Sequence, residues 1–88
     1  MAVVTLRAPL RDLAGGSSRL EVSGATVAEV IGRLEREHPR LAGWVLDERG
    51  RIREHVKVFV NGDVAGLEHP VAATDQVHVL PAISGGRD

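Results

Sequence analysis

The chain has 88 residues and a formal net charge of −1, so we expect one small domain with a single core and no deep active-site cleft. The near-neutral charge and the presence of only two aromatic residues, Trp44 and Phe59, argue against a nucleic-acid partner. Cysteine is absent, which excludes disulfides, thiolate catalysis and cysteine metal ligands, so any sulfur chemistry needs sulfur supplied from outside.

The sequence also lacks the features of an exported or membrane protein. It has no basic segment leading into an apolar leader, and no apolar run approaches the length of a transmembrane helix. We therefore expect a cytoplasmic protein without a membrane partner.

Two strands joined by a long connection are predicted first. Residues 3–7 form a β-branched run that ends at Ala8-Pro9, and residues 19–23 alternate polar and apolar side chains. Between them, residues 15–18 read Gly-Gly-Ser-Ser, which favours a turn. Together these features predict an N-terminal β-hairpin.

A helix is predicted after Thr26, because Thr26 and Glu29 have the spacing of a capping box. Its apolar residues recur at helical spacing and form one face; they are Val27, Val30, Ile31 and Leu34. His38-Pro39 ends the helix, because a residue before proline disfavours helical dihedral angles. The apolar residues in 41–46 predict a short irregular or helical segment that caps the core, with Trp44 packed at its edge.

The strongest strand prediction covers residues 56–60, which read Val-Lys-Val-Phe-Val. Asn61-Gly62 follows, the preferred pair for a tight type I′ turn, and a short strand near Val64 returns from it. After a loop, residues 76–80 form the last strand, which ends at Pro81.

The predicted order is therefore strand, strand, helix, strand, short strand and strand. An amphipathic helix lying across a mixed sheet is a stable two-layer arrangement for a small α+β domain. The β-grasp, or ubiquitin-like, fold has this order, with four to five strands, one main helix and the last strand in the centre beside the first. We predict a β-grasp domain over residues 1–82, followed by a flexible C-terminal tail over residues 83–88.

The last strand and the residues after it carry a family resemblance. Residues 75–86 read Asp-Gln-Val-His-Val-Leu-Pro-Ala-Ile-Ser-Gly-Gly, which resembles the C-terminal signature of the bacterial ThiS/MoaD sulfur carriers. Residues 58–62 resemble the central strand and turn of that family, and the Thr26 capping box resembles the start of its helix. The run before Gly-Gly looks closer to the cysteine-biosynthesis carriers than to the molybdopterin-synthase subunits.

This resemblance implies a carrier that is not itself an enzyme and binds no cofactor. An ATP-dependent activating enzyme would adenylate the carboxylate of the terminal glycine, here Gly86, and a sulfur donor would displace AMP to leave a thiocarboxylate. The thiocarboxylate would donate sulfur to a biosynthetic enzyme, for cysteine or another sulfur-containing metabolite. Gly85 would supply clearance in a narrow partner channel, because glycine has no Cβ. We expect the free carrier to be a monomer.

The chain departs from the family pattern after Gly86. Arg87 and Asp88 follow it, so the carboxyl group of Gly86 is held in a peptide bond and cannot be adenylated. Some relatives carry short extensions that a zinc metalloprotease of the JAMM type removes. We therefore predict that a protease of this kind cleaves after Gly86 and releases Arg87 and Asp88.

An exposed apolar patch is predicted from strand alternation. Phe59 has the opposite parity from Val58 and Val60, so it points away from the helix if these valines point toward it. Together with Leu80 and Ile83, Phe59 would form a docking patch for partners on the helix-free face, because exposed apolar patches mark partner sites. In the other register, Phe59 is ordinary core.

The remaining polar residues give weaker signals. The histidines lack the spacing of a metal site, so no metal is expected; they are His38, His55, His69 and His78. Asp47 and Glu48 are better explained by a solvated turn than by a catalytic pair. Four arginines either help to dock an acidic partner or are solvated surface; they are Arg7, Arg11, Arg51 and Arg53.

Three other functions stay open. A small subunit of a molybdopterin-synthase-like complex would use the same tail and would co-purify with a larger subunit. A ubiquitin-like modifier would be joined through Gly86 to lysines of its targets, leaving isopeptide-linked Gly-Gly remnants. An interaction module without tail chemistry would be unaffected by removal of Gly85 and Gly86.

Overall fold

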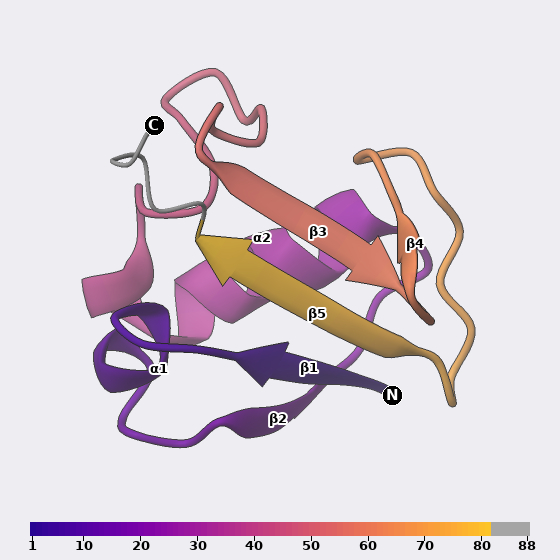
Figure 1. Cartoon of the computed structure of the whole chain (residues 1–88), viewed down its shortest axis with the longest axis horizontal. Coiled ribbons are helices and arrows are strands. Elements are labelled where there is room, and N and C mark those ends of the chain that lie inside the picture. Colours follow the sequence, from indigo (N-terminus) through magenta and orange to yellow (C-terminus); the bar gives the residue numbers. More distant parts are fainter. Residues whose placement is uncertain (82–88) are drawn as a thin grey trace.

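One mixed sheet carries the long helix α2 (Val27–Glu37) across one face (Figure 1). The computed structural model describes residues 1–81. The strands are β1 (Ala2–Leu6), β2 (Arg19–Val22), β3 (Val56–Val60), β4 (Asp63–Val64) and β5 (Gln76–Pro81). They lie in the order β2-β1-β5-β3-β4, so the last strand is central, as predicted for a β-grasp domain.

The register of β5 places alternate side chains under the helix. β5 runs parallel to β1 and antiparallel to β3, with Val77 opposite both Val4 and Val60. Because directly paired residues share a face of the sheet, these valines project to the same side. All three are buried, together with the apolar face of α2, and they form the core of the domain. The N-terminal hairpin is present as predicted, with β1 antiparallel to β2.

Helix α2 begins and ends where the sequence predicts. Thr26 is its N-cap, and Thr26 Oγ1 accepts a hydrogen bond from the backbone N–H of Glu29 at 3.2 Å. The Glu29 carboxylate accepts in return from the backbone N–H of Ala25 at 2.8 Å, one residue before the cap. The helix ends at Glu37, directly before the His38-Pro39 pair.

One of the connections differs from the sequence interpretation. A short helix, α1 (Leu10–Leu13), lies in the β1–β2 connection, where only a turn was predicted. The apolar spacing of Leu10, Leu13 and Ala14 is its signal, and it buries Leu10 and Ala14 against the core. The segment after α2 contains the 3-10 helix η1 (Pro39–Leu41), in line with the prediction of a short segment that caps the core.

Trp44 was expected at the edge of the core, and this expectation is wrong. Its side chain is 49% exposed, whereas Leu41 and Val45 on either side are fully buried. Gly43 between them has φ +87°, a left-handed conformation that glycine adopts without strain. The chain therefore turns at Gly43, so that Leu41 and Val45 both point inward and Trp44 points outward.

The turn after β3 has the predicted geometry. Asn61 and Gly62 both have positive φ, at 52° and 92°, as a type I′ turn requires. None of the helices within residues 1–81 has the length and apolar character needed to cross a membrane.

Candidate functional site

The described part of the chain ends at Pro81, the last residue of β5. The last pairing of β5 with β1 joins Val79 to Leu6, whereas the pairing with β3 continues to Pro81, opposite Val56. β5 therefore ends at the end of the sheet where β1 stops and β3 begins (Figure 1). The predicted tail lies outside the described residues, and with it the predicted site residues Ile83, Gly85, Gly86, Arg87 and Asp88.

The start of β5 is held by a carboxylate–amide pair that the sequence analysis missed. Asp75 Oδ1 accepts from Asn61 Nδ2 at 2.9 Å, and Asp75 Oδ2 accepts from the backbone N–H of Ala72 at 2.8 Å. Asn61 Oδ1 accepts in turn from the backbone N–H of Gln76 at 3.0 Å. The N–H of Ala72, followed by the amide of Asn61, holds the pKa of Asp75 below its ordinary value. This pair joins the β3–β4 turn to the first residue of the strand that leads to the tail.

Phe59 and Leu80 lie on the helix-free face of the sheet. Val58 and Val60 are buried under α2, whereas Phe59 between them is half-buried on the opposite side. Phe59 is paired with His78, and Leu80 follows two residues later on the same face of β5. With Gly62 these three residues line a shallow hollow of about 170 Å³ whose surface is mostly apolar. Of the two alternatives, Phe59 on the helix-free face is therefore correct, and Phe59 as ordinary core is wrong.

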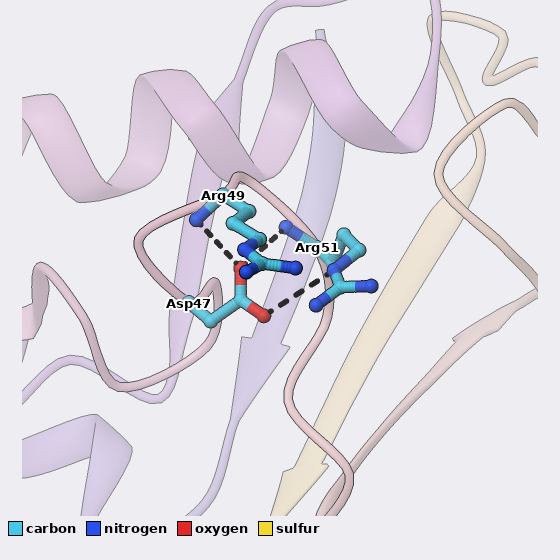
Figure 2. Close-up of polar contacts among 3 residues, drawn as sticks. All are labelled: Asp47, Arg49 and Arg51. Atoms are coloured by element: carbon cyan, nitrogen blue, oxygen red, sulfur yellow. Dashed lines mark hydrogen bonds and ion pairs between the residues drawn. The ribbon is translucent and has the colours of Figure 1, made fainter.

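The loop before β3 is organised around Asp47 (Figure 2). Asp47 Oδ1 accepts from the backbone N–H groups of Arg49 and Arg51, both at 2.9 Å, and Asp47 Oδ2 lies 3.6 Å from Arg51 Nε. The backbone N–H of Arg51, then that of Arg49 and the charges of Arg51 and Arg53, hold the pKa of Asp47 below its ordinary value. Asp47 is thus a structural residue of a turn, as predicted, and it orders a loop that carries three arginines.

Glu35 of α2 connects this loop to the helix. Glu35 Oε2 accepts from the backbone N–H groups of Val45 at 3.2 Å and Leu46 at 3.1 Å. Val45 is buried, and Leu46 packs against the core and bridges to Ile52 across the loop. No local pattern indicates this role, because a glutamate beside the apolar face of a helix does not reveal a partner ten residues later.

The histidines do not come together. His38 caps the C-terminus of α2, His78 lies in β5, and His55 and His69 lie in separate loops. Within residues 1–81, no group of three or more His, Asp or Glu side chains is arranged to hold a metal ion.

A small mixed sheet with an amphipathic helix across one face and the last strand at its centre defines a β-grasp, ubiquitin-like domain. The match to known families agrees with this architecture. The ThiS family profile matches residues 4–86, and the chain belongs to the ThiS family.

The relatives of the chain are small proteins of similar length. Small archaeal modifier protein 1 of Haloferax volcanii is 36% identical over 83 residues, covering 92% of this chain and 95% of the relative. Sulfur carrier protein CysO of Mycobacterium tuberculosis is 32% identical over 91 residues, covering 94% of this chain and 98% of the relative. A chain in the crystal structure of the Amycolatopsis orientalis BexX/CysO complex matches with a TM-score of 0.87 and 31% identity, over 98% of this chain and 100% of that chain. The predicted resemblance to ThiS/MoaD carriers of the cysteine-biosynthesis type is confirmed.

Proposed function

We propose that this chain is a sulfur carrier that receives sulfur as a thiocarboxylate on Gly86, after Arg87 and Asp88 have been removed. The observation that supports this most is the family match, which spans the β-grasp domain and ends at Gly86. The name of the relative CysO, a sulfur carrier protein, supports the same role. The fold is compatible with it, because β5 leads the chain out of the sheet only five residues before Gly86.

The chemistry needs activation because a carboxylate is a poor electrophile. An oxygen of the Gly86 carboxylate would attack the α-phosphorus of ATP, releasing pyrophosphate and forming an acyl-adenylate. A donor supplying sulfur at the oxidation level of sulfide would then attack the carbonyl carbon, the carbon–oxygen bond to AMP would break, and a thiocarboxylate would remain. The chain has no cysteine, so a partner enzyme would supply the sulfur, and the activating enzyme would supply the ATP site.

The domain would set how far Gly86 can extend into a partner, and it would supply the surface that the partner contacts. Five residues from Ala82 to Gly86 span at most about 18 Å when fully extended, which limits the depth of a channel that Gly86 can enter while the domain stays outside. A partner holding these residues would lie close to the end of β5. It would cover the predicted patch of Phe59, Leu80 and Ile83, the first two of which line the hollow on the helix-free face.

Intact mass spectrometry of the protein isolated from its native host tests the proposal. The expected species lacks Arg87 and Asp88, and a fraction of it has one oxygen replaced by sulfur. In vitro, a chain ending at Gly86 should be converted by the activating enzyme, ATP and a sulfide donor. The full chain is the matched control and should stay unmodified until a protease is added. A host protein that always keeps both residues and never gains sulfur refutes the proposal.

A second candidate function is that of a ubiquitin-like modifier, which the 36% identity to a small archaeal modifier protein favours. In that case the activated carbonyl of Gly86 would be attacked by a lysine ε-amine of a target protein instead of by sulfur. Host lysines joined by an isopeptide bond to Gly86 of this chain, detected as branched peptides and absent from a strain carrying a chain truncated after Ser84, would establish this function. Their absence in the wild-type strain would exclude it.

A further inference from the structure

The charges of the domain are segregated along the direction of β5. Every lysine and arginine of residues 1–81 falls in one of three stretches, 7–19, 33–40 or 49–57, and none occurs in 20–32 or 58–81. The latter two stretches carry acidic residues instead; they are Glu21, Glu29, Asp63, Glu68 and Asp75. Although the net charge of the chain is only −1, its sequence therefore contains separate basic and acidic regions.

The fold turns this pattern into two ends of the molecule. β1 stops and β3 begins at the end of the sheet where β5 finishes, so the basic stretches 7–19 and 49–57 both lie at that end, one on each side of β5 (Figure 1). The acidic residues Asp63, Glu68 and Asp75 lie at the other end, where β5 starts and where the N-terminus of α2 is hydrogen-bonded to the loop at His69. Residues 7–19 and 47–57 together hold seven basic and four acidic side chains, so that end keeps a positive excess.

Basic residues flank the last residues of β5 on both sides. Lys57 of β3 is paired directly with Leu80, and Arg7 follows Leu6, whose partner is Val79 of β5. Both side chains are exposed, and neither forms an ion pair within the described part of the chain. The two cations therefore flank the point at which the chain leaves the sheet.

The loop before β3 extends this charged region and gives it a defined shape. Arg51 and Arg53 line a hollow of about 420 Å³ together with His55, which directly precedes Val56, the partner of Pro81 in β5. Asp47 and Glu54 also line it; Asp47 accepts hydrogen bonds from the backbone of its own loop and lies 3.6 Å from Arg51 Nε, so it offsets part of the charge of Arg51. Arg53 is held by a hydrogen bond from its Nε to the carbonyl oxygen of Gly43. The guanidinium groups are thus presented on a loop fixed by Asp47 and Glu35.

We infer that Arg7, Arg49, Arg51, Arg53 and Lys57 form a basic docking surface for a protein partner that presents carboxylates around the opening that receives the C-terminal residues. This inference rests on the proposed function, because the partner is the activating enzyme of that function. The inference adds that the docking surface of this enzyme is acidic. Charge complementarity around a rim accelerates encounter and sets orientation, and it repels partners that carry the wrong charge. The acidic end of the domain disfavours approach in the reverse orientation, in which Gly86 would point away from the partner.

A charge-reversed pair and a matched control test the inference. Arg7→Glu with Lys57→Glu reverses two charges beside the end of β5 and leaves the Asp47 loop intact. Arg33→Glu with Arg36→Glu makes the same change in net charge on exposed positions of α2, away from the helix-free face. Association of each variant with the host's activating enzyme is measured by stopped flow at low and at high salt, and thermal unfolding confirms that both variants are folded.

At low salt, the Arg7/Lys57 variant should associate about tenfold more slowly than the wild type, whereas the Arg33/Arg36 variant should change less than about threefold. At about 0.5 M salt the three rates should converge, because the ions screen exposed charges. Equal slowing of both variants, or a wild-type rate independent of salt, overturns the inference.

Loading with sulfur, followed by mass spectrometry, separates this inference from the proposed function when the wild type and the Arg7/Lys57 variant are both prepared as chains that end at Gly86. A wild type that gains sulfur while the Arg7/Lys57 variant associates and is loaded at the same rate refutes only the docking surface. A wild type that neither binds the activating enzyme nor gains sulfur refutes the proposed function and the docking surface with it.

Discussion

Substitution of Glu35 by alanine should destabilise the domain by loosening the loop that carries Arg49, Arg51 and Arg53. The change removes the acceptor of two backbone N–H groups, those of Val45 and Leu46. A buried donor left without its partner costs about 1–3 kcal/mol, and one that water can reach costs less. Val45 is fully buried and Leu46 is half-buried, so we expect a loss of about 2 kcal/mol in the free energy of unfolding.

This loss corresponds to a factor of about 30 in the ratio of folded to unfolded molecules. Glu35→Gln keeps one acceptor oxygen without its charge and should cost about 1 kcal/mol. Urea unfolding at pH 7 measures both values, and amide hydrogen exchange at Val45 and Leu46 reports the loop directly. Glu37→Ala is the matched control, because Glu37 is exposed on the same helix and has no hydrogen-bond partner for its side chain within residues 1–81.

The control should change the free energy of unfolding by less than about 0.5 kcal/mol. The reasoning is wrong if Glu35→Ala is as stable as Glu37→Ala. It is also wrong if the amides of Val45 and Leu46 keep their protection in Glu35→Ala, since their hydrogen bonds would then not depend on the carboxylate.

Two further substitutions test the ends of β5. Because the folded-state pKa of Asp75 is lowered from about 3.8, its stabilising effect is present above that pH and is lost as pH falls through the lower folded value. Asp75→Asn should therefore lower the melting temperature most near neutral pH, and the difference from the wild type should shrink below about pH 4. Melting curves of the wild type and of Asp75→Asn over this pH range test the prediction, with Asp63→Asn as the control. A difference in melting temperature between Asp75→Asn and the wild type that does not vary with pH contradicts the prediction. Phe59→Ser should weaken binding to the activating enzyme about tenfold or more in calorimetry, as for a buried aromatic anchor. Trp44→Ser, which changes a 49% exposed aromatic side chain outside the sheet, should have little effect, and equal losses would contradict docking at Phe59.

The regular elements were predictable because local patterns determine them. The Thr26 cap, the apolar face of α2, the alternation in residues 56–60 and the Asn61-Gly62 turn each lie within a few neighbouring residues. Each pattern also agrees with the same fold order, which is why the β-grasp topology followed from the sequence. The helix α1 was missed because it has only four residues and lies between a proline and two glycines. A segment of this length is too short to show a helical period.

The contacts that shape the candidate site join residues that are distant along the chain. Asn61 and Asp75 are separated by 14 residues, and Glu35 lies 10 and 11 residues from the backbone groups that it accepts from. Nothing in a single sequence relates such positions, because the hydrogen bonds form only once the sheet and helix have placed both partners. The outward position of Trp44 likewise depends on the left-handed conformation of Gly43.

The sequence by itself determined the class of domain and the chemistry available to it: a small core, no cysteine, a central last strand and a Gly-Gly pair at residues 85 and 86. Only the tertiary structure decided how the charges are arranged. In the sequence, Arg7, Arg51, Arg53 and Lys57 are scattered over about half of the chain. The parallel pairing of β1 with β5 and the antiparallel pairing of β3 with β5 bring them to one end of the sheet. The physical reason is that strand direction, which is set by long-range pairing, determines which end of the domain each residue occupies.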